Sequence, residues 1–573
     1  MKTKENITNE ANVVRQIDPS YSQLFDVDLI ASAYQEIKSK PGNMAPGADG
    51  VTLDGISRSW AESTIEALKD RSYKCKPVRR VFIPKANGKL RPLGIPCPRD
   101  KVVQLAFKRI LESVFEPIFK DTSHGFRPGR SPHTALYEVR KWSGTTWMIE
   151  GDIKGFFDNL DHHKLADLLK TKIKDKNLID LYWKMARAGY VSEGGGVTRN
   201  NLGVPQGGII SPLLSNIYLH EFDKFMEGLC NRYTDQNKRV SRHNPEYAKV
   251  KRAGDKEALK YIPSMIRDET TGYRVRYNRY ADDWVIGVSA PRHIVVKIVD
   301  EVEHFLKETL SLELSREKTK ITHLEQEKAL YLGVEIGRRP RSYTESLVST
   351  TKTGITRRGS NTRIVLYAPM SRIVERLVDH GFAWSSSKPK ALTKWVYLEP
   401  ADIIARYNAV IRGLLNYYKF VENRNLFTHV TWILKFSAAL TLAIKWNISP
   451  AKVFKRLGTN LTVTIPPAGK KGKPRKISFA SPDTLKRDRS FKVDNYQSWD
   501  PFVVKYYSVR SNFIWDNPCI ICGSKEKVEM HHVKHIKKVK VSRKWWNSWI
   551  ESRCRSVGPA TLKYITDNMT GRP

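Results

Sequence analysis

The 573-residue sequence predicts an α+β protein built from several units, in which a large mixed unit precedes a helical one. Three observations support this class. Residues 20–345 alternate helical stretches with short runs of β-forming residues and turn signals such as KANGKLRPLGIP. The later stretch IIARYNAVIRGLLNYYKF repeats apolar residues at helical spacing. A chain of this length exceeds what one hydrophobic core supports, so we expect roughly three to five domains or subdomains.

Composition shifts along the sequence divide this expected architecture into four parts, with boundaries at 1–345, 346–455, 456–514 and 515–573. Residues 222–275 turn polar and charged, which we interpret as a surface excursion rather than core. A basic, Ser/Thr-rich linker near 350–363 precedes the helical unit. The basic segment GKKGKPRK then marks a small region before the terminal CxxC pair. The apolar stripe of the helical unit is typical of a core and consists of Ile404, Tyr407, Ile411, Leu414, Leu415 and Tyr418.

The charge balance predicts a polyanionic partner. Lysine and arginine total 98 against 59 acidic residues, a formal net charge of +39. Self-repulsion of this size disfavours a compact protein unless a polyanion compensates it. The basic residues run through the whole sequence rather than along one amphipathic helix, which favours nucleic acid over a membrane surface. No run of 18 apolar residues is present, so we expect no membrane partner.

Cysteine usage and the amino terminus indicate the cellular compartment in which the protein works. The six cysteines are sparse and, one CxxC apart, unpatterned, which predicts a reducing environment. Residues 1–20 contain Glu5, Glu10 and Asp18 and no apolar core, a composition that fits neither a secretory signal nor an acid-poor transit peptide. We therefore expect the protein to work where it is made. The sequence leaves a homodimer open.

The sharpest local signal is a pair of adjacent aspartates within β-forming residues. In RYNRYADDWVIGV, Asp282 and Asp283 interrupt a strand-like run. Adjacent carboxylates repel one another, and half-buried carboxylates are costly unless a cation neutralises them. A surface turn is the alternative, but the strand-like flanks on both sides favour a metal-binding hairpin. Upstream, WMIEGDIKGFFDNLDH places Asp152 after an apolar run, from which it can converge on the same metal ions.

These two motifs resemble the palm of reverse transcriptases, and further segments resemble those of group II intron-encoded reverse transcriptase/maturases in the same order. The segments are KSKPGNMAPGADG (38–50), VFIPKANGKLRPLGIPCPRDKVVQ (81–104), SHGFRPGRSPHTAL (123–136), GVPQGGIISPLLSNIYL (203–219), LELSREKTKIT (312–322) and YLGVEI (331–336). The resemblance implies a right-hand polymerase with fingers and palm over 1–345 and an α-helical thumb or maturase (X) domain over 346–455. A small basic DNA-binding region over 456–514 and a truncated HNH (ββα-metal) segment over 515–573 would follow.

The resemblance assigns the polymerase chemistry to the paired motifs. Asp152 and Asp282 would ligate two Mg²⁺ ions, with the carbonyl of Ile153 as a further ligand and Asp283 as a third carboxylate. Such paired ions activate a primer 3′-hydroxyl and stabilise the charge on the departing pyrophosphate. Gln206, within PQGG, matches a residue that lines the nucleotide pocket, where the glycines let the backbone approach the substrate.

Other matched residues would bind the incoming nucleotide. Lys85 and Arg91, in a fingers-like hairpin, match positions that grip the triphosphate. Phe157 matches the steric gate, whose ring would clash with a ribose 2′-hydroxyl, so it implies DNA synthesis. Its neighbour Phe156 is expected in the core. Lys318 matches a residue that protonates pyrophosphate, with a solvated lysine in a charged turn as the alternative.

The function that the resemblance implies is that of a multifunctional intron-encoded protein. It would assist splicing of its own group II intron RNA and copy that RNA into DNA from dNTPs by target-primed reverse transcription. The helices of 365–455 would bind the structured RNA through phosphates and shape, and residues 456–515 would bind target DNA, a flexible basic linker being the alternative.

Two other functions and two compartments stay open from the sequence. One alternative function is a splicing maturase that has lost polymerisation. The other is a retron-like reverse transcriptase unconnected with splicing, against which the long thumb and the HNH-like tail argue. Because the segments look most like those of mitochondrial intron proteins, we expect the mitochondrion, with the bacterial cytoplasm as the alternative.

The stretch CIICGSKEKVEMHHVKHI (519–536) resembles the first half of an HNH nuclease. By that match Cys519 and Cys522 would share a structural Zn²⁺ with a second CxxC pair. Glu529 would orient the site, His531 would bind the catalytic metal, and His532 would be the general base that activates water.

The second half of the nuclease pattern, a CxxCH followed by another histidine, is missing. After His535 the sequence contains Cys554 and no histidine. A shifted reading frame joins the last base of each codon with the first two bases of the next. From Lys540 onward, such a frame is compatible with a peptide that contains both missing features. We therefore predict that residues 541–573 are a one-base frameshift product, with a degenerate tail as the alternative. The zinc site would then be incomplete and the nuclease inactive.

Overall fold

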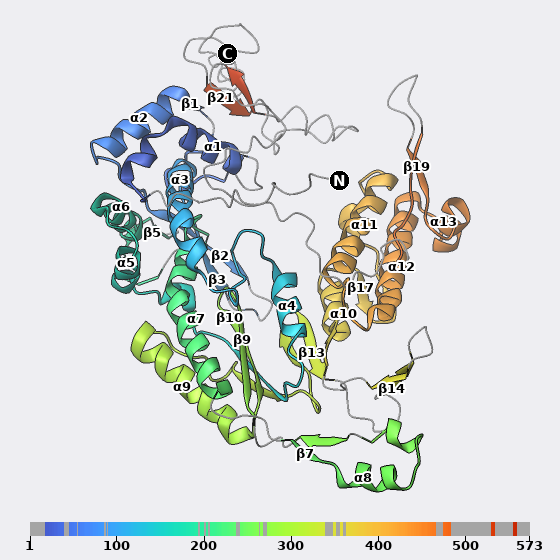
Figure 1. The fold of residues 1–573 in the computed structure, drawn as a ribbon. Helices are drawn as coiled ribbons and strands as arrows, with labels where there is room; N and C mark the ends of the chain where they lie inside the picture. Colours follow the sequence, from blue (N-terminus) through green and yellow to red (C-terminus); the bar gives the residue numbers. More distant parts are fainter. Residues whose placement is uncertain are drawn as a thin grey trace, which may run out of the picture.

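In the computed structural model, helices flank a central sheet on both sides (Figure 1). Each side of the sheet contributes to its own hydrophobic core. The first core underlies the predicted fingers and palm, and the second extends into the predicted thumb. The structure describes residues 18–38, 45–53, 55–84, 88, 90–192, 195–199, 202–203, 207–235, 241–262, 264–267, 272–338, 348–350, 356–358, 363–465, 474–482, 529–532 and 554–557.

The central sheet is antiparallel and has the strand order β11, β4, β10, β9. Its strands are β4 (Trp147–Gly151), β9 (Arg274–Tyr280), β10 (Asp283–Ser289) and β11 (Lys320–His323). Because side chains alternate between the faces of a strand, neighbouring residues enter different cores. Ile149, Trp284 and Ile286 join the first core. Met148 and Val285 join the second, so the apolar runs beside Asp152 and the paired aspartates are buried on both faces.

Helices cover both faces of this sheet. On the first face lie α7 (Ser211–Asp235) and α9 (Arg292–Leu310), and on the second lies α4 (Pro132–Arg140) (Figure 1). The interpretation of 222–275 as a surface excursion was wrong for its first part. Phe222 and Met226 of α7 are fully buried, because they belong to an apolar helical stripe that faces the core. Polar residues alternate with this stripe along the helix. The excursion begins after α7 and contains β7 (Ser241–His243), α8 (Pro245–Arg252) and β8 (Met265–Arg267).

The fingers part is a helical layer beside a second small sheet of order β3, β2, β5, β6. Its hairpin pairs β2 (Val78–Pro84) with β3 (Leu90–Ile95), and the short strands β5 (Tyr190–Val191) and β6 (Val197–Thr198) extend it. The apolar helix α3 (Pro98–Phe115) begins with a proline at its first turn and packs through the middle of this part. The other helices here are α1 (Val27–Lys38), α2 (Arg58–Lys69), α5 (His162–Lys170) and α6 (Lys176–Ala186).

The thumb part is helical, as the sequence predicts, and its helices are α10 (Met370–Asp379), α11 (Pro400–Tyr417), α12 (Phe427–Trp446) and α13 (Pro450–Leu457). Of the predicted apolar stripe, every member is buried except Leu414, which is half-buried. The short strand pairs of this region are β14 (Val348–Thr350) with β15 (Thr356–Arg358), β17 (Ala383–Ser385) with β18 (Lys388–Pro389), and β19 (Val463–Ile465) with β20 (Arg475–Ile477).

A three-stranded sheet joins the palm to the thumb. It contains β12 (Ala329–Tyr331) and β13 (Val334–Arg338), which follow the palm, and β16 (Ile364–Tyr367), which leads into α10. At its turn the hydroxyl of Tyr417 donates to the carbonyl of Leu332 over 2.6 Å, and that of Tyr418 donates to Gly333 over 2.9 Å. The His133 ring of α4 lies 2.8 Å from the Tyr417 carbonyl through Nε2. We call these contacts the tyrosine joint.

Helix α12 is the one described helix whose length and apolar composition would allow it to cross a membrane. Most of that apolar window, 61%, is buried inside the protein. Ile433, Leu434 and Leu442 are fully buried in the second core. The helix therefore has the character of a core helix of the thumb.

Replacing Gly151 by alanine should destabilise the central sheet. A Cβ atom there would overlap the Trp284 ring, which is 1% exposed and has no room to move. Overpacking of this kind costs about 1–3 kcal/mol of unfolding free energy. Gly228→Ala is the control, because a Cβ at that exposed position in α7 meets nothing and should stabilise by about 0.5–1 kcal/mol. Thermal unfolding of the two variants should move in opposite directions, and equal shifts would contradict this packing.

Candidate active site

Asp152 is fixed at the end of β4 by backbone contacts with residues 313–315. The Ser315 amide donates to the Asp152 carbonyl, and the Lys154 amide donates to the Glu313 carbonyl, both over 2.9 Å. These bonds enclose an antiparallel bridge between Ile153 and Leu314 that forms no hydrogen bonds of its own. The Ile153 carbonyl therefore points away from Leu314, toward the β10 side of β4. This orientation suits the ligand role that the resemblance assigns to it.

Asp282 and Asp283 are placed by a tight hairpin between β9 and β10. Tyr280 pairs with Asp283, which leaves Ala281 and Asp282 as a two-residue loop. Ala281 has φ +59°, the value for the first loop residue of a II′ turn, a position that favours glycine. An alanine there is strained and persists only where its surroundings hold it.

The register of the sheet brings the two motifs together. Trp284 pairs with Gly151, so one step further along both strands sets Asp283 beside Asp152. The predicted convergence of the aspartates at one end of the sheet therefore agrees with the strand pairing. None of the contributing strands alone could produce it, since β4 and β10 are separated by more than a hundred residues.

Burial and neighbouring negative charges together set the electrostatics of this site. Burial raises the pKa of Asp282, and the negative charge of Asp152 raises it further. The Asp283 carboxylate reaches solvent, yet surrounding protein partly desolvates it. Together with the charges of Asp282 and Asp152, that desolvation raises the pKa of Asp283 to about 6. The carboxylates thus form an anionic site with a need for counter-charge.

Two predicted nucleotide-binding cations supply part of that counter-charge. Lys318 Nζ lies 2.6 Å from Asp152 Oδ2, although most of the lysine side chain is exposed. Arg91, exposed on β3 opposite Ile83, is near enough for its charge to lower the pKa of Asp282. Lys318 is thus no isolated surface lysine. Among the described residues, no set of three or more His, Cys, Asp or Glu side chains is arranged as a metal-ligand cluster.

The two aromatic residues that follow Asp152 differ in burial. Phe156 is 2% exposed and packs in the first core, which confirms that prediction. Phe157 is half-buried at the core's edge, with its ring centroid 5.2 Å from that of Phe156. The remaining predicted nucleotide-binding residues, Lys85 and Gln206, lie outside the described residues.

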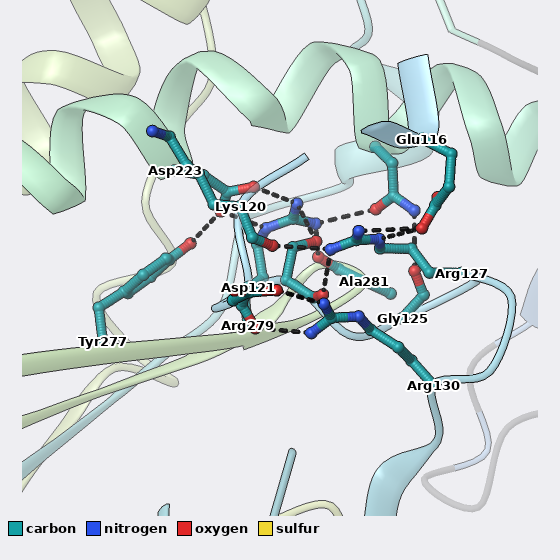
Figure 2. A network of polar contacts seen from close by, with 12 residues as sticks. Glu116, Lys120, Asp121, Gly125, Arg127, Arg130, Asp223, Tyr277, Arg279 and Ala281 are labelled. Carbon is teal, nitrogen blue, oxygen red and sulfur yellow. Dashed lines mark hydrogen bonds and ion pairs between the residues drawn. The ribbon is translucent and has the colours of Figure 1, made fainter. Parts of the chain in front are cut away.

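A buried polar cluster beneath the hairpin was not predicted from the sequence. Arg279 and Asp223 form an ion pair in which both side chains are 0% exposed. The Tyr277 hydroxyl donates to Asp223 Oδ1 over 2.9 Å, and Arg279 also contacts Ser123 and Asn216 (Figure 2). We call these five residues the polar hub. The one sequence signal for it is the position of Arg279 in RVRYNRY, two residues after Tyr277 and four after Val275, which places it on the strand face that these two residues bury.

A second set of ion pairs fixes the loop that runs beneath the hub. Arg127 Nε donates to Glu116 Oε1 over 2.9 Å, and its Nη1 donates to two loop carbonyls (Figure 2). Arg130 pairs with Asp121 over 2.5 Å. These contacts explain why the segment SHGFRPGRSP is rich in arginine although much of it is buried.

Little of the predicted nuclease segment falls within the described residues. Cys519 and Cys522 lie outside them. Glu529, His531 and His532 belong to strand β21 (Glu529–His532), which pairs with β1 (Ile56–Ser57) and with β22 (Cys554–Val557). The strand pairing sets His532 opposite Cys554. The roles assigned to these residues stay predictions.

The sheet, its terminal carboxylates and the basic hairpin facing them define a palm of the nucleic-acid polymerase type. Two family models agree with that class. The model described as "Reverse transcriptase (RNA-dependent DNA polymerase)" matches residues 83–336, and the model described as "Type II intron maturase" matches residues 361–511.

Relatives in curated collections of proteins cover most of the chain. The group II intron-encoded protein LtrA of Lactococcus lactis subsp. cremoris is 34% identical over 96% of this chain and 95% of its own length. The COX1/OXI3 intron 1 protein of Saccharomyces cerevisiae is 34% identical over 92% of the chain, and a 91 kDa protein in the cob intron of Schizosaccharomyces pombe is 36% identical over 90%. The chain spans 65% of each yeast protein. It belongs to the group II intron-encoded reverse transcriptase/maturase family, which confirms the resemblance of the sequence segments.

Acid should destabilise the loop under the hairpin through His124. Burial, with the charges of Arg130, Arg127 and Arg279, lowers the pKa of His124 from 6.5 to about 3. The folded protein therefore holds this ring neutral, while the unfolded chain binds a proton below pH 6.5, so stability falls as pH drops through that value. At pH 5.5 the loss from this group is about 1.4 kcal/mol.

The test compares thermal unfolding of the protein and of His124→Asn between pH 8 and pH 5. Asparagine can keep the 2.9 Å contact that His124 Nδ1 makes with Thr134 Oγ1 but cannot titrate. The variant should show a shallower loss of stability below pH 6.5. An identical pH profile for both proteins would contradict a buried neutral ring.

Proposed function

We propose that the protein is an RNA-directed DNA polymerase and splicing maturase that assists splicing of its own group II intron RNA and copies it by target-primed reverse transcription. The observation that carries the proposal is the convergence of Asp152, Asp282 and Asp283 at one end of the palm, next to Arg91. This convergence stands in a chain whose family is shown over nearly its whole length.

The residues of the palm fit a divalent cation. Burial and the charges of neighbouring carboxylates raise the pKa values of Asp282 and Asp283, and a hard cation prefers carboxylate and carbonyl oxygens. Asp152, Asp282 and the Ile153 carbonyl would hold Mg²⁺, with Asp283 as a third carboxylate. When bound, two such ions would activate the primer 3′-hydroxyl and stabilise the leaving pyrophosphate.

Side chains around the carboxylates would bind and select the nucleotide. Arg91 and Lys85 would neutralise the triphosphate, and Gln206 would line the pocket. Phe157, half-buried beside the palm, would exclude a ribose 2′-hydroxyl and so favour dNTPs. Lys318, whose Nζ lies 2.6 Å from Asp152 Oδ2, would donate a proton to the departing pyrophosphate.

The thumb and the basic regions would provide the nucleic-acid surfaces. A net charge of +39 supports binding of intron RNA through its phosphates by the helical thumb, and binding of target DNA by the basic region 456–514. The second candidate, a splicing maturase without polymerisation, lacks support because Asp152, Asp282, Asp283, Arg91 and Phe157 are all present.

The terminal segment and the compartment complete the proposal. The HNH nuclease would be inactive and its zinc site incomplete, because the second CxxC pair is missing from residues 541–573. Relatives named for yeast cytochrome introns support a mitochondrial, organelle-encoded protein, while the Lactococcus lactis relative leaves a bacterial cytoplasm as the alternative.

Asp282→Ala should lower the rate of primer extension on an RNA template in Mg²⁺ by about 1,000-fold, which leaves almost no extension. Binding of intron RNA and assisted splicing should survive, because they use fingers and thumb surfaces. The matched control is Asp167→Ala on α5, which removes an exposed aspartate that pairs with Lys170, away from the palm carboxylates. Equal loss of RNA binding and extension by a folded Asp282→Ala protein would refute this division of labour.

Phe157→Val should raise incorporation of ribonucleotides relative to deoxynucleotides by about tenfold or more, because a smaller side chain admits the 2′-hydroxyl. The measurement is the ratio of kcat/KM for the two nucleotides on one template. Phe156→Val is the control: it leaves a cavity in the core and should lower stability without changing the ratio. An unchanged ratio for Phe157→Val would remove this residue from the gate.

A further inference from the structure

The guanidinium of Arg279 uses every one of its five donors in a site without water-exposed surface. Nε and Nη2 bind the two oxygens of Asp223 over 2.8 and 2.6 Å. Nη2 also donates to Ser123 Oγ over 2.7 Å, and Nη1 donates to Asn216 Oδ1 over 3.1 Å. The fifth bond runs from Nη1 to the carbonyl of Ala281 over 2.8 Å. Figure 2 shows these contacts converging from α7, the 120–130 loop and the hairpin.

The fifth bond connects the polar hub to the strained turn. Ala281 has φ +59° and immediately precedes the paired aspartates. The backbone of Gly125 also packs against the turn, since a Cβ there would overlap the Ala281 amide nitrogen. Asn216 links the two supports, because its Nδ2 donates to the Gly125 carbonyl over 2.8 Å while its Oδ1 accepts from Arg279. The turn is therefore held at its carbonyl by Arg279 and at its amide by the Gly125 backbone.

Stability alone is a poor explanation for this arrangement. Burying a guanidinium and a carboxylate costs several kcal/mol per ion, and their attraction often does no more than offset that cost. The hub instead fixes the position of the turn relative to β9. The backbone of Arg279 bonds to Thr122 and His124, and its side chain bonds to the Ala281 carbonyl in the turn. A planar group with five donors can impose such geometry, whereas a lysine ammonium cannot.

We propose that Arg279 is a positioning residue that, with Asn216 and Gly125, holds the Ala281 turn so that Asp282 and Asp283 face Asp152 in a cation-binding arrangement. The role of the bound cation in catalysis rests on the proposed function. Apart from that role, divalent-cation affinity at the palm depends on a hydrogen bond to the Ala281 carbonyl, which is no metal ligand. Partners beyond the ligands commonly set metal affinity by about 10- to 100-fold.

Arg279→Lys is the test, with Arg109→Lys as its matched control. Both changes replace a buried, multiply bonded guanidinium, but Arg109 contacts Ser32 and Glu36 of α1 and not the turn. Mn²⁺ binding, followed by the paramagnetic resonance of the free ion, should weaken about tenfold in Arg279→Lys. Arg109→Lys should lose thermal stability and keep its Mn²⁺ affinity. In primer extension, kcat of Arg279→Lys should fall about 100-fold while KM for dNTP stays within about threefold.

Gly125→Ala provides a second variant in case Arg279→Lys does not fold. It keeps the ion pair and displaces the turn by contact with the Ala281 amide, so Mn²⁺ affinity should fall as in Arg279→Lys. If the variants that fold bind Mn²⁺ as the unmodified protein does, the positioning role is overturned. If the unmodified protein binds Mn²⁺ but extends no primer, the proposed polymerase function fails, while the affinity shift still decides the positioning role.

Discussion

Repulsion among Asp152, Asp282 and Asp283 is the constraint around which the palm is built. Carboxylates of like charge at one sheet end resist being brought together, and each surrounding feature counters that resistance in a different way. The antiparallel register of β4 and β10 leaves the aspartates no freedom to separate along the strands. Lys318 and Arg91 offer charge from the solvent side, and the buried hub fixes the turn from below. Opposing forces of this kind are what give a site its affinity for cations.

The structural features that the sequence predicts are those with a local sequence pattern. The apolar runs around the paired aspartates identify two strands, and helical periodicity identifies the thumb stripe and the buried Phe156. Segment order adds the polymerase architecture, because a family fixes the arrangement of elements that periodicity alone cannot place. Asp152 and Asp282 could therefore be brought together before any coordinates were known.

The unpredicted parts depend on contacts between distant segments. Asp223 sits in a polar stretch of α7 that reads as solvent-exposed, yet it meets Arg279 with no exposed surface at all. Lys318 lies in a charged turn, and only the bridge between Ile153 and Leu314 carries that turn to Asp152. Polarity in a sequence indicates exposure only on average, and buried charged pairs at functional sites are where that average fails.

The sheet shared by palm and thumb bears on how such a protein can be inherited. β13 of the palm side pairs with β16, and the tyrosine joint binds the backbone carbonyls of Leu332 and Gly333, so its bonds do not depend on the side chain at Leu332. A gene fragment that ended before β16 would encode a palm with an open strand edge, a surface prone to aggregation. A palm inherited without the thumb would therefore need another segment to cover β13.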